Sequence, residues 1–245
     1  MFSIFRTNKK GTSRSSFFQE FQELKRLEKQ TIPRFKFEAE DFYPCLEDNT
    51  PYTPFDRHYI YHPAWAARVL QQTRPEKHVD ISSTLYFCSI VSAFIPVDFY
   101  DYRPANLCLS DFRSLKANLL SLPFESGSVE SISCMHTVEH VGLGRYGDTL
   151  DYDGDLKAVN ELIRVVQPKG DLLFVVPVGC ENKISFNAHR IYTKEHVLRL
   201  FGEFDLKQFC LIPENESHGG LIESPTDLDL ARETYGCGCF WFKKR

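Results

Sequence analysis

The sequence lacks the long apolar segments that membrane-spanning or exported proteins carry. Its longest apolar run, residues 85–97, is interrupted by serine and closed by Pro96, so it is too short to span a bilayer. Residues 1–10 have no apolar core of the kind found in signal peptides. The composition is otherwise that of a folded protein, with 42% hydrophobic and 25% charged residues. We therefore expect one α/β domain with a small N-terminal appendage and no membrane span.

Closely spaced cysteine pairs of the CxxC type are also missing. The eight cysteines are scattered along the chain, and several lie inside apolar runs, where cysteine packs as a small hydrophobic residue. Cys237 and Cys239 form a lone CxC pair, which in a strand is more often a packing feature than a metal site. Together with the missing export signal, this pattern predicts reduced thiols in the cytoplasm and no bound metal.

The chain has no basic stripe. Its 29 Lys and Arg residues against 33 Asp and Glu give a formal net charge of -4. This balance argues against nucleic acid as the main partner. Only residues 1–15 are locally basic, and we expect them to form a frayed tail.

Residues 1–74 are expected to form a tail, a helix and an irregular segment that wraps the domain. A helix should open at Ser16, with an apolar stripe that covers the sheet or pairs with another subunit. Residues 31–57 show no periodicity, and a further helix should begin at His62-Pro63. The stripe consists of Phe17, Phe21, Leu24 and Leu27.

Residues 75–245 alternate between strand and helix patterns. We expect strands at 77–81, 97–100, 112–117, 129–135, 171–178, 205–212 and 238–243, and helices at 84–94, 155–166 and 193–201. The piece between 101 and 112 is too short for a crossover helix. The pattern predicts a Rossmann-like, mostly parallel sheet with helices on both faces and an antiparallel last strand.

Ionisable and turn-forming residues are concentrated behind the strand at 129–135. His136, Glu139 and His140 follow it, and a glycine-rich loop with Arg145, Tyr146 and Asp148 comes next. Ligands of open α/β sheets bind beyond the carboxyl ends of the strands. We therefore expect this strand end to be the working face.

The first two strands form a βαβ unit with an acid at the end of each. Asp80 and Asp101 are about 21 residues apart, close to the spacing that places a carboxylate on a ribose hydroxyl. A short first turn lets a ligand approach the backbone and the following helix N-terminus. Here the turn contains Ser82 and Ser83 where glycines would be expected.

Several segments resemble the class I S-adenosylmethionine-dependent methyltransferases. They are Leu122-Pro123-Phe124, Ser128-Val129-Glu130, Glu139-His140, and the run Arg164–Gly170 before an apolar strand. HTVEHVGLGRYGD and the segment 186–192, FNAHRIY, look more particularly like an uncharacterised, domain-of-unknown-function branch known from bacteria and nematodes. The resemblance spans residues 77–243.

The resemblance implies a cofactor site along the first three strand ends. The amino-acid end of the cofactor would lie at Asp80 to Ser83, its ribose on Asp101, and its adenine near Asn118 and Leu119. The serines of the first turn and Asn118, which stands where an acid is commoner, depart from the family pattern. An Asn can still bond the adenine amino group.

Three other motifs are weaker. His136-x-x-Glu139-His140 matches the HxxEH zinc-hydrolase pattern, but its first His lies at a strand end rather than on a helical face. The formal GxGxxG at 142–147 follows the fourth strand instead of the first. The acids at 151, 153 and 155 lack the closing Glu of a calcium loop and fit a helix N-terminus.

We expect O-methylation of a small or sugar-like acceptor, with a histidine as general base. His136 is the first candidate, Glu139 and His140 would orient or replace it, and His189 is the outside choice. The acceptor would contact the side chains of Arg145, Tyr146, Asn187 and Arg190. For Arg145, a structural pairing with Asp148 is an equal alternative. Two other functions remain open, namely a non-catalytic methyltransferase-like binding module and a nicotinamide-dependent enzyme.

Overall fold

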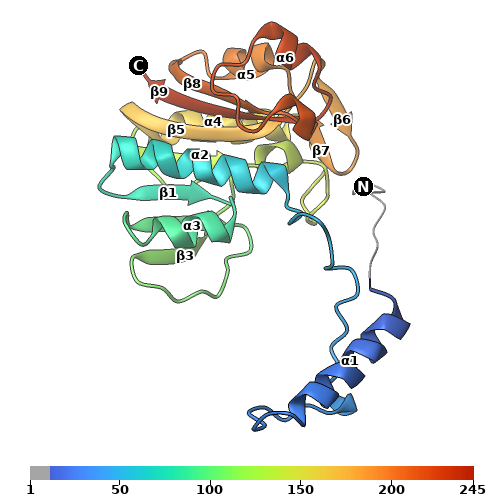
Figure 1. Ribbon diagram of the computed structural model, residues 1–245. Coiled ribbons are helices and arrows are strands. Elements are labelled where there is room, and N and C mark those ends of the chain that lie inside the picture. The colour runs from blue at the N-terminus through green and yellow to red at the C-terminus, as the bar shows by residue number, and fades with distance from the viewer. Residues whose placement is uncertain (1–11) are drawn as a thin grey trace. The chain divides into compact units, whose positions relative to one another are not determined.

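The computed structural model describes residues 12–245, and the chain divides into two compact units between Phe55 and Asp56 (Figure 1). Most of the predicted basic tail, residues 1–11, lies outside the described part. No helix among the described residues is both long enough and apolar enough to cross a membrane.

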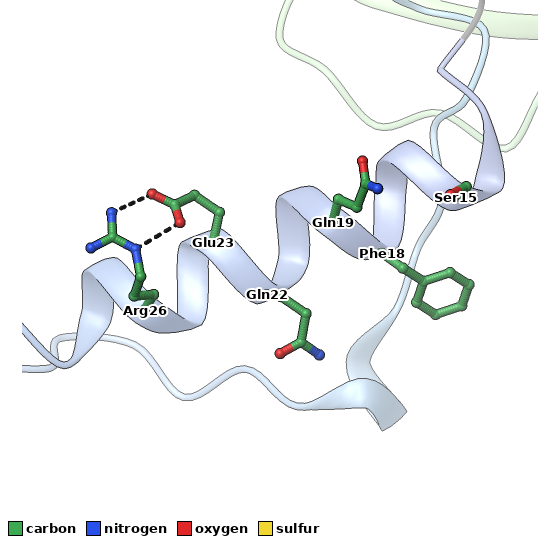
Figure 2. A pocket seen from close by; sticks show the side chains of 6 residues that line it. All are labelled: Ser15, Phe18, Gln19, Gln22, Glu23 and Arg26. Atoms are coloured by element: carbon green, nitrogen blue, oxygen red, sulfur yellow. Dashed lines mark hydrogen bonds and ion pairs between the residues drawn. The ribbon is translucent and has the colours of Figure 1, made fainter.

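The N-terminal unit is built on α1 (Arg14–Glu28), with the short 3-10 helix η1 (Ala39–Asp41) in the segment that follows. Ser13 caps α1 by accepting the Ser16 N–H at 3.0 Å, so the helix begins before the predicted start. Phe21 packs edge to face on Phe42 at 4.7 Å between ring centroids. None of the side chains from 12 to 55 is fully buried. Figure 2 shows an open face of α1, where Arg26 and Glu23 form a two-bond ion pair.

The second unit contains a seven-stranded sheet in the order β3-β2-β1-β4-β5-β9-β8. Six strands run in one direction, and β9 runs antiparallel to both of its neighbours, which confirms the mostly parallel sheet and the antiparallel last strand. The observed strands are β1 (His78–Ile81), β2 (Val97–Asp101), β3 (Phe112–Lys116), β4 (Val129–Met135), β5 (Val166–Val178), β8 (Phe204–Ile212) and β9 (Gly236–Lys244).

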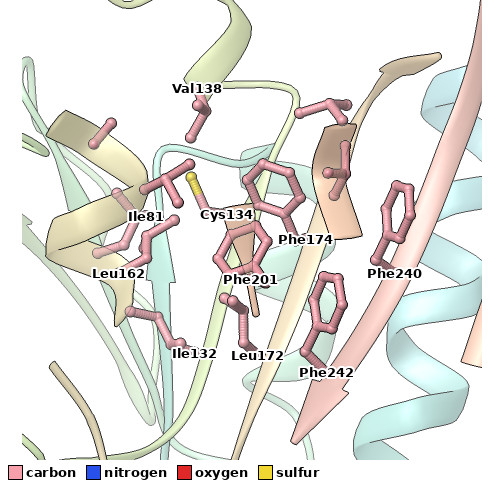
Figure 3. Packing of buried hydrophobic residues seen from close by; sticks show 14 of the residues in the cluster. Ile81, Ile132, Cys134, Val138, Leu162, Leu172, Phe174, Phe201, Phe240 and Phe242 are labelled. Carbon is pink, nitrogen blue, oxygen red and sulfur yellow. The ribbon is translucent and has the colours of Figure 1, made fainter. Parts of the chain in front are cut away.

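Helices cover both faces of this sheet, as predicted (Figure 1). On one face, α2 (Arg57–Thr73) and α3 (Leu85–Val91) bury a cluster that includes Trp65 and Cys239. On the other, α4 (Gly154–Val165) and α5 (Lys194–Leu200) bury a larger cluster. In Figure 3, the Phe201 ring of this larger cluster packs on the rings of Phe174 and Phe242, with centroids 4.8 and 4.9 Å away. The connections carry η2 (Val138–His140), η3 (Glu216–His218) and α6 (Asp227–Ala231).

One local prediction was wrong, and one element was not predicted. The second helix begins at Arg57, not at His62, because Asp56 caps it by accepting the Tyr59 N–H at 3.1 Å. Pro63 therefore lies inside α2, and His58 and Tyr59 lie on its first turn. The FNAHRIY segment, for which no strand was predicted, contributes to a small hairpin of β6 (Lys183–Ser185) and β7 (His189–Ile191).

Candidate functional site

The carboxyl ends of β1, β2, β4 and β5 lie at one edge of the sheet. Because β9 is antiparallel, it begins at that same edge, where Gly236 is paired with Val178 and Cys237 with Pro177. The first turn of α2 reaches this edge too, since the His58 ring stacks on the ring of His136. Six separate parts of the chain therefore reach this edge.

Asp80, at the end of β1, is fully buried and bonded within the protein. Its carboxylate accepts hydrogen bonds from the Ser133 hydroxyl and, at 2.9 Å, from the Ser83 N–H. The His78 ring lies between the hydroxyls of Ser131 and Ser133, at 2.8 Å from each. Burial raises the pKa of Asp80 to about 6 and lowers the pKa of His78 to about 3. Asp80 thus holds the turn after β1 in place.

The turn after β1 is tied to the neighbouring strand ends. Ser82 has a left-handed backbone with φ of 55°, the conformation for which glycine is favoured. Its hydroxyl donates to the Tyr100 carbonyl at 3.2 Å, and the Thr137 hydroxyl donates to the Ser82 carbonyl at 3.0 Å. The Met135 N–H donates to the Ser83 hydroxyl at 3.1 Å. Ser82 thus adopts the left-handed backbone that a glycine would favour at this position.

Asp101 is half-buried at the end of β2. Its Oδ1 accepts the Arg103 N–H at 2.6 Å. The next strand end carries Asn118, which is exposed and accepts the Leu120 N–H at 2.9 Å, and Leu119, which is buried. Arg103 lies over the Tyr146 ring, 5.0 Å from its centroid, so the loop after β2 borders the glycine-rich loop after β4.

His136 follows β4 with φ of 55° and is buried. Its Nδ1 is 2.9 Å from Glu139 Oε1, and its Nε2 is 3.4 Å from Cys237 Sγ. The rings of His58 and Tyr59 both stack on it with centroids 5.3 Å away. His136 is therefore a buried member of a ring cluster, with both nitrogens engaged.

Glu139 is 1% exposed and lies between two histidines. Its Oε1 also lies 3.7 Å from His140 Nε2, while its Oε2 has no hydrogen-bond partner among the described residues. The other nitrogen of His140, Nδ1, is 2.6 Å from the Ala188 carbonyl oxygen and donates to it. His140 thus links the loop after β4 to the β6–β7 hairpin.

The glycine-rich loop is held together by hydrogen bonds to the carboxylate of Asp148, which belongs to the same loop. Asp148 accepts the N–H groups of Gly142 at 2.7 Å, Gly144 at 3.3 Å and Tyr146 at 3.2 Å. The pKa of Asp148 is lowered, because these bonds outweigh the desolvation that opposes them. Arg145 donates instead to the Ala188 carbonyl at 3.1 Å, and Tyr146 is exposed.

The hairpin supplies the remaining predicted residues. Asn187 is exposed in its turn, whereas Arg190 is buried and donates to the carbonyls of Val141 at 2.6 Å and Tyr152 at 2.9 Å. Arg190 therefore stabilises the loop after β4 through hydrogen bonds to its backbone. His189 is half-buried and stacks on Tyr235 at 4.7 Å; desolvation lowers its pKa.

The structure adds three residues to the edge: His58, Tyr235 and Cys237. Tyr235 and Cys237 were not assigned to the site, and for His58 a hydrogen-bonded surface at the helix start was favoured over contact with a ligand. His58 lies within 5.3 Å of both the His136 ring and the Tyr235 ring. The histidine-rich start of α2 was a visible signal, but the helix was expected to begin after it. Cys237 carried no signal beyond its CxC spacing.

Comparison with known proteins gives one partial family match and one relative. Residues 124–217 match the family described as Caenorhabditis protein of unknown function, DUF268. An uncharacterised protein of Methanocaldococcus jannaschii is 29% identical over 106 residues, which cover 42% of this chain. The match spans only 40% of that relative's length.

Solved structures of similar fold include methyltransferases. The MccD protein has a TM-score of 0.52 at 11% identity, over 74% of this chain and 96% of its own. A chain from the complex of a methyltransferase activator with a putative methyltransferase of Haloferax volcanii has a TM-score of 0.52 at 18% identity, over 77% and 90%. A Burkholderia thailandensis 1,6-didemethyltoxoflavin-N1-methyltransferase with bound S-adenosylhomocysteine has a TM-score of 0.52 at 10% identity, over 75% and 78%. The likeness shows that this chain has the Rossmann-like methyltransferase fold.

Proposed function

We propose that this protein is an S-adenosylmethionine-dependent methyltransferase that methylates a hydroxyl of a small or sugar-like acceptor. The fold supports this proposal, since one similar structure holds S-adenosylhomocysteine. The cofactor supplies a methyl group on a sulfonium, and the protein has to align that group with the acceptor. Alignment alone can lower such a barrier by about 7–11 kcal/mol.

The observation that carries the proposal is the half-buried carboxylate of Asp101 beside the turn after β1. Strand β2 is paired with β1, with Tyr100 opposite Ile81, so Asp101 and Ser82 end neighbouring strands. A carboxylate has acceptor capacity beyond the one bond to Arg103, enough for two ribose hydroxyls. In this proposal Asn118 and Leu119 border the adenine, and Ser82 and Ser83 the amino-acid end.

His189 is the general base in this proposal. Both ring nitrogens of His136 are engaged by Glu139 and Cys237, so His136 is poorly placed to take a proton from an acceptor. His189 is half-buried, and its lowered pKa keeps its ring neutral and able to accept a proton at pH 7. Arg145 and Tyr146, on the exposed loop, and Asn187, in the hairpin turn, would border the acceptor.

Calorimetric titration of the full chain with S-adenosylmethionine tests the cofactor site. Asp101→Ala should weaken binding about 10- to 100-fold, because a hydrogen bond to a charged group contributes about 1.5–3 kcal/mol. Glu125→Ala removes an exposed acid before β4 and should leave the affinity unchanged. A wild-type chain that binds neither S-adenosylmethionine nor S-adenosylhomocysteine at millimolar concentration would contradict the proposal.

A non-catalytic binding module is the second candidate. It is favoured by the turn after β1, where Asp80 is used entirely inside the protein and Ser82 occupies a left-handed position. Cofactor binding without S-adenosylhomocysteine release, across a panel of hydroxylated acceptors, would support this alternative. A nicotinamide enzyme is less favoured, because the N–H groups of the Gly142 loop already bond to Asp148.

A further inference from the structure

Three potential metal ligands from distant parts of the sequence meet at the carboxyl edge of the sheet. They are His58 on the first turn of α2, His136 at the end of β4, and Cys237 at the start of β9. One ligand atom from each lies within 4.8 Å of the other two, and all three residues are buried. This separation is close enough for a single ion to reach all three after small side-chain adjustments.

The His136 imidazole is held as metal-binding histidines usually are. His136 directs Nδ1 to Glu139 Oε1 at 2.9 Å, so its Nε2 faces Cys237 Sγ at 3.4 Å. The His58 ring lies between the rings of His136 and Tyr235, with centroids 5.3 and 5.2 Å away. Ligating histidines characteristically donate their second N–H to a carboxylate or a backbone carbonyl, which fixes the tautomer and leaves the other nitrogen for the metal.

Two buried polar atoms beside the cluster have no partner among the described residues. One is Oε2 of Glu139, a 1% exposed carboxylate, and the other is Nε2 of His62, whose residue is fully buried. The His62 ring lies edge to face on His136 at 5.1 Å. A divalent cation would supply positive charge near the buried carboxylate, and water on the cation would supply a hydrogen-bond donor.

We propose that His58, His136 and Cys237 bind one Zn²⁺ ion. Two imidazoles and one thiolate are ligands that zinc prefers, and three protein ligands leave a fourth position for water or an acceptor oxygen. On binding, the Cys237 thiol loses its proton to solvent and forms the sulfur–zinc bond, with no change in oxidation state. The ion joins α2, β4 and β9, and this site does not depend on the proposed methyl transfer.

Metal analysis of the full chain tests this site. After loading with Zn²⁺ or Co²⁺ and dialysis, the wild type should retain about one equivalent, and the Co²⁺ form should show cobalt–thiolate charge-transfer absorption. Cys237→Ser should lose that absorption, and His58→Gln should lose most of the bound metal. Cys239→Ser is the matched control, because Cys239 is buried two residues along the same strand and lies outside the ligand set.

Glu139→Gln adds a test of the orienting carboxylate and should weaken zinc affinity about 10- to 100-fold. A chelator should lower the melting temperature of the wild type and of Cys239→Ser, which gives a result even if Cys237→Ser or His58→Gln folds poorly. The proposal is overturned if the loaded wild type retains no metal, or if Cys239→Ser loses metal as Cys237→Ser does. Metal retention without thiolate absorption would remove Cys237 from the site.

Discussion

Buried ionisable side chains at the strand ends form hydrogen bonds within the protein, and these hydrogen bonds explain why the side chains can be buried. Asp80 and His78 on β1 share the hydroxyl of Ser133 on β4, and the two strands are paired at Asp80 and Ser133. A buried carboxylate is tolerated only when hydrogen bonds offset the lost hydration. Asp80 therefore stabilises the turn after β1 through its hydrogen bonds. Asp101, at the end of β2, retains acceptor capacity for a ligand.

The raised pKa of Asp80 predicts a pH-dependent effect of Asp80→Asn on stability. The folded-state pKa is about 6, against 3.8 for the ordinary side chain, so the folded protein holds this proton more tightly than the unfolded chain. The Asp80 contribution is thus most favourable below pH 4 and is lost as pH rises through 6. Relative to wild type, Asp80→Asn should gain about 2 kcal/mol of unfolding free energy between pH 4 and pH 7.

Urea unfolding of wild type and Asp80→Asn at several pH values measures this difference. Loss of the Asp80 hydrogen bonds lowers the unfolding free energy of the variant by the same amount at every pH. The test is therefore how the difference in unfolding free energy between variant and wild type changes with pH. Asp153→Asn, which changes an exposed acid, is the control and should give a flat difference. A flat difference for Asp80→Asn as well would show that its pKa is not raised.

The identity of single site residues was only partly predictable from the sequence. Asp80, Asp101 and His136 were located correctly at strand ends, because the apolar runs before them mark the strands. The partners of these residues come from strand register and from distant elements, as Ser133, His58 and Cys237 do. A linear pattern carries no information on such pairing, so the enclosure of His136 could not be foreseen.

The glycine-rich loop after β4 is shaped by a close backbone approach. Gly142 has φ of 81°, and a Cβ added there would lie 2.1 Å from the Asp151 carbonyl oxygen. Gly147 has nearly the same φ, 82°, but a Cβ there would have nothing within 4 Å. The two glycines thus have nearly the same φ and differ in the space around them.

Alanine substitution at these two glycines should separate the energetic cost of a left-handed backbone from the cost of a steric clash. Gly147→Ala should cost about 1 kcal/mol of unfolding free energy, the cost of a left-handed alanine. Gly142→Ala should cost about 3–5 kcal/mol, because the backbone must also shift away from Asp151. Denaturant unfolding of both variants measures the costs, and equal values would rule out the close approach at Gly142.

Element positions were predictable where an apolar run of the right length existed. Strand β4 has the predicted bounds, and α4 and α5 lie within one residue of theirs at each end. The start of α2 was missed, because Pro63 was taken as a first-turn proline although Asp56 supplies the cap. The β6–β7 hairpin was missed because its three-residue strands are too short to show alternation.

At the scale of the whole molecule, the two hydrophobic clusters lie entirely within one unit. Their buried members run from Trp65 to Phe242, and they include side chains from the strands and from α2, α3, α4 and α5. The sequence analysis divided the chain after residue 74, whereas the compact units divide at Phe55. Helix α2 packs on β8, β9 and α3, so it completes the sheet unit.

Because that core is complete without residues 1–53, we expect a chain that begins at residue 54 to fold by itself. Its melting temperature should match that of the main transition of the full chain, measured by scanning calorimetry at equal concentration. The shortened chain retains Asp56, so Asp56→Ala in it should remove the α2 cap and cost about 1 kcal/mol. A clear fall in melting temperature on shortening alone would mean that the sheet unit draws stability from the N-terminal unit. In that case the buried clusters on the two sheet faces would not suffice to hold the strand ends, and with them the site, in place.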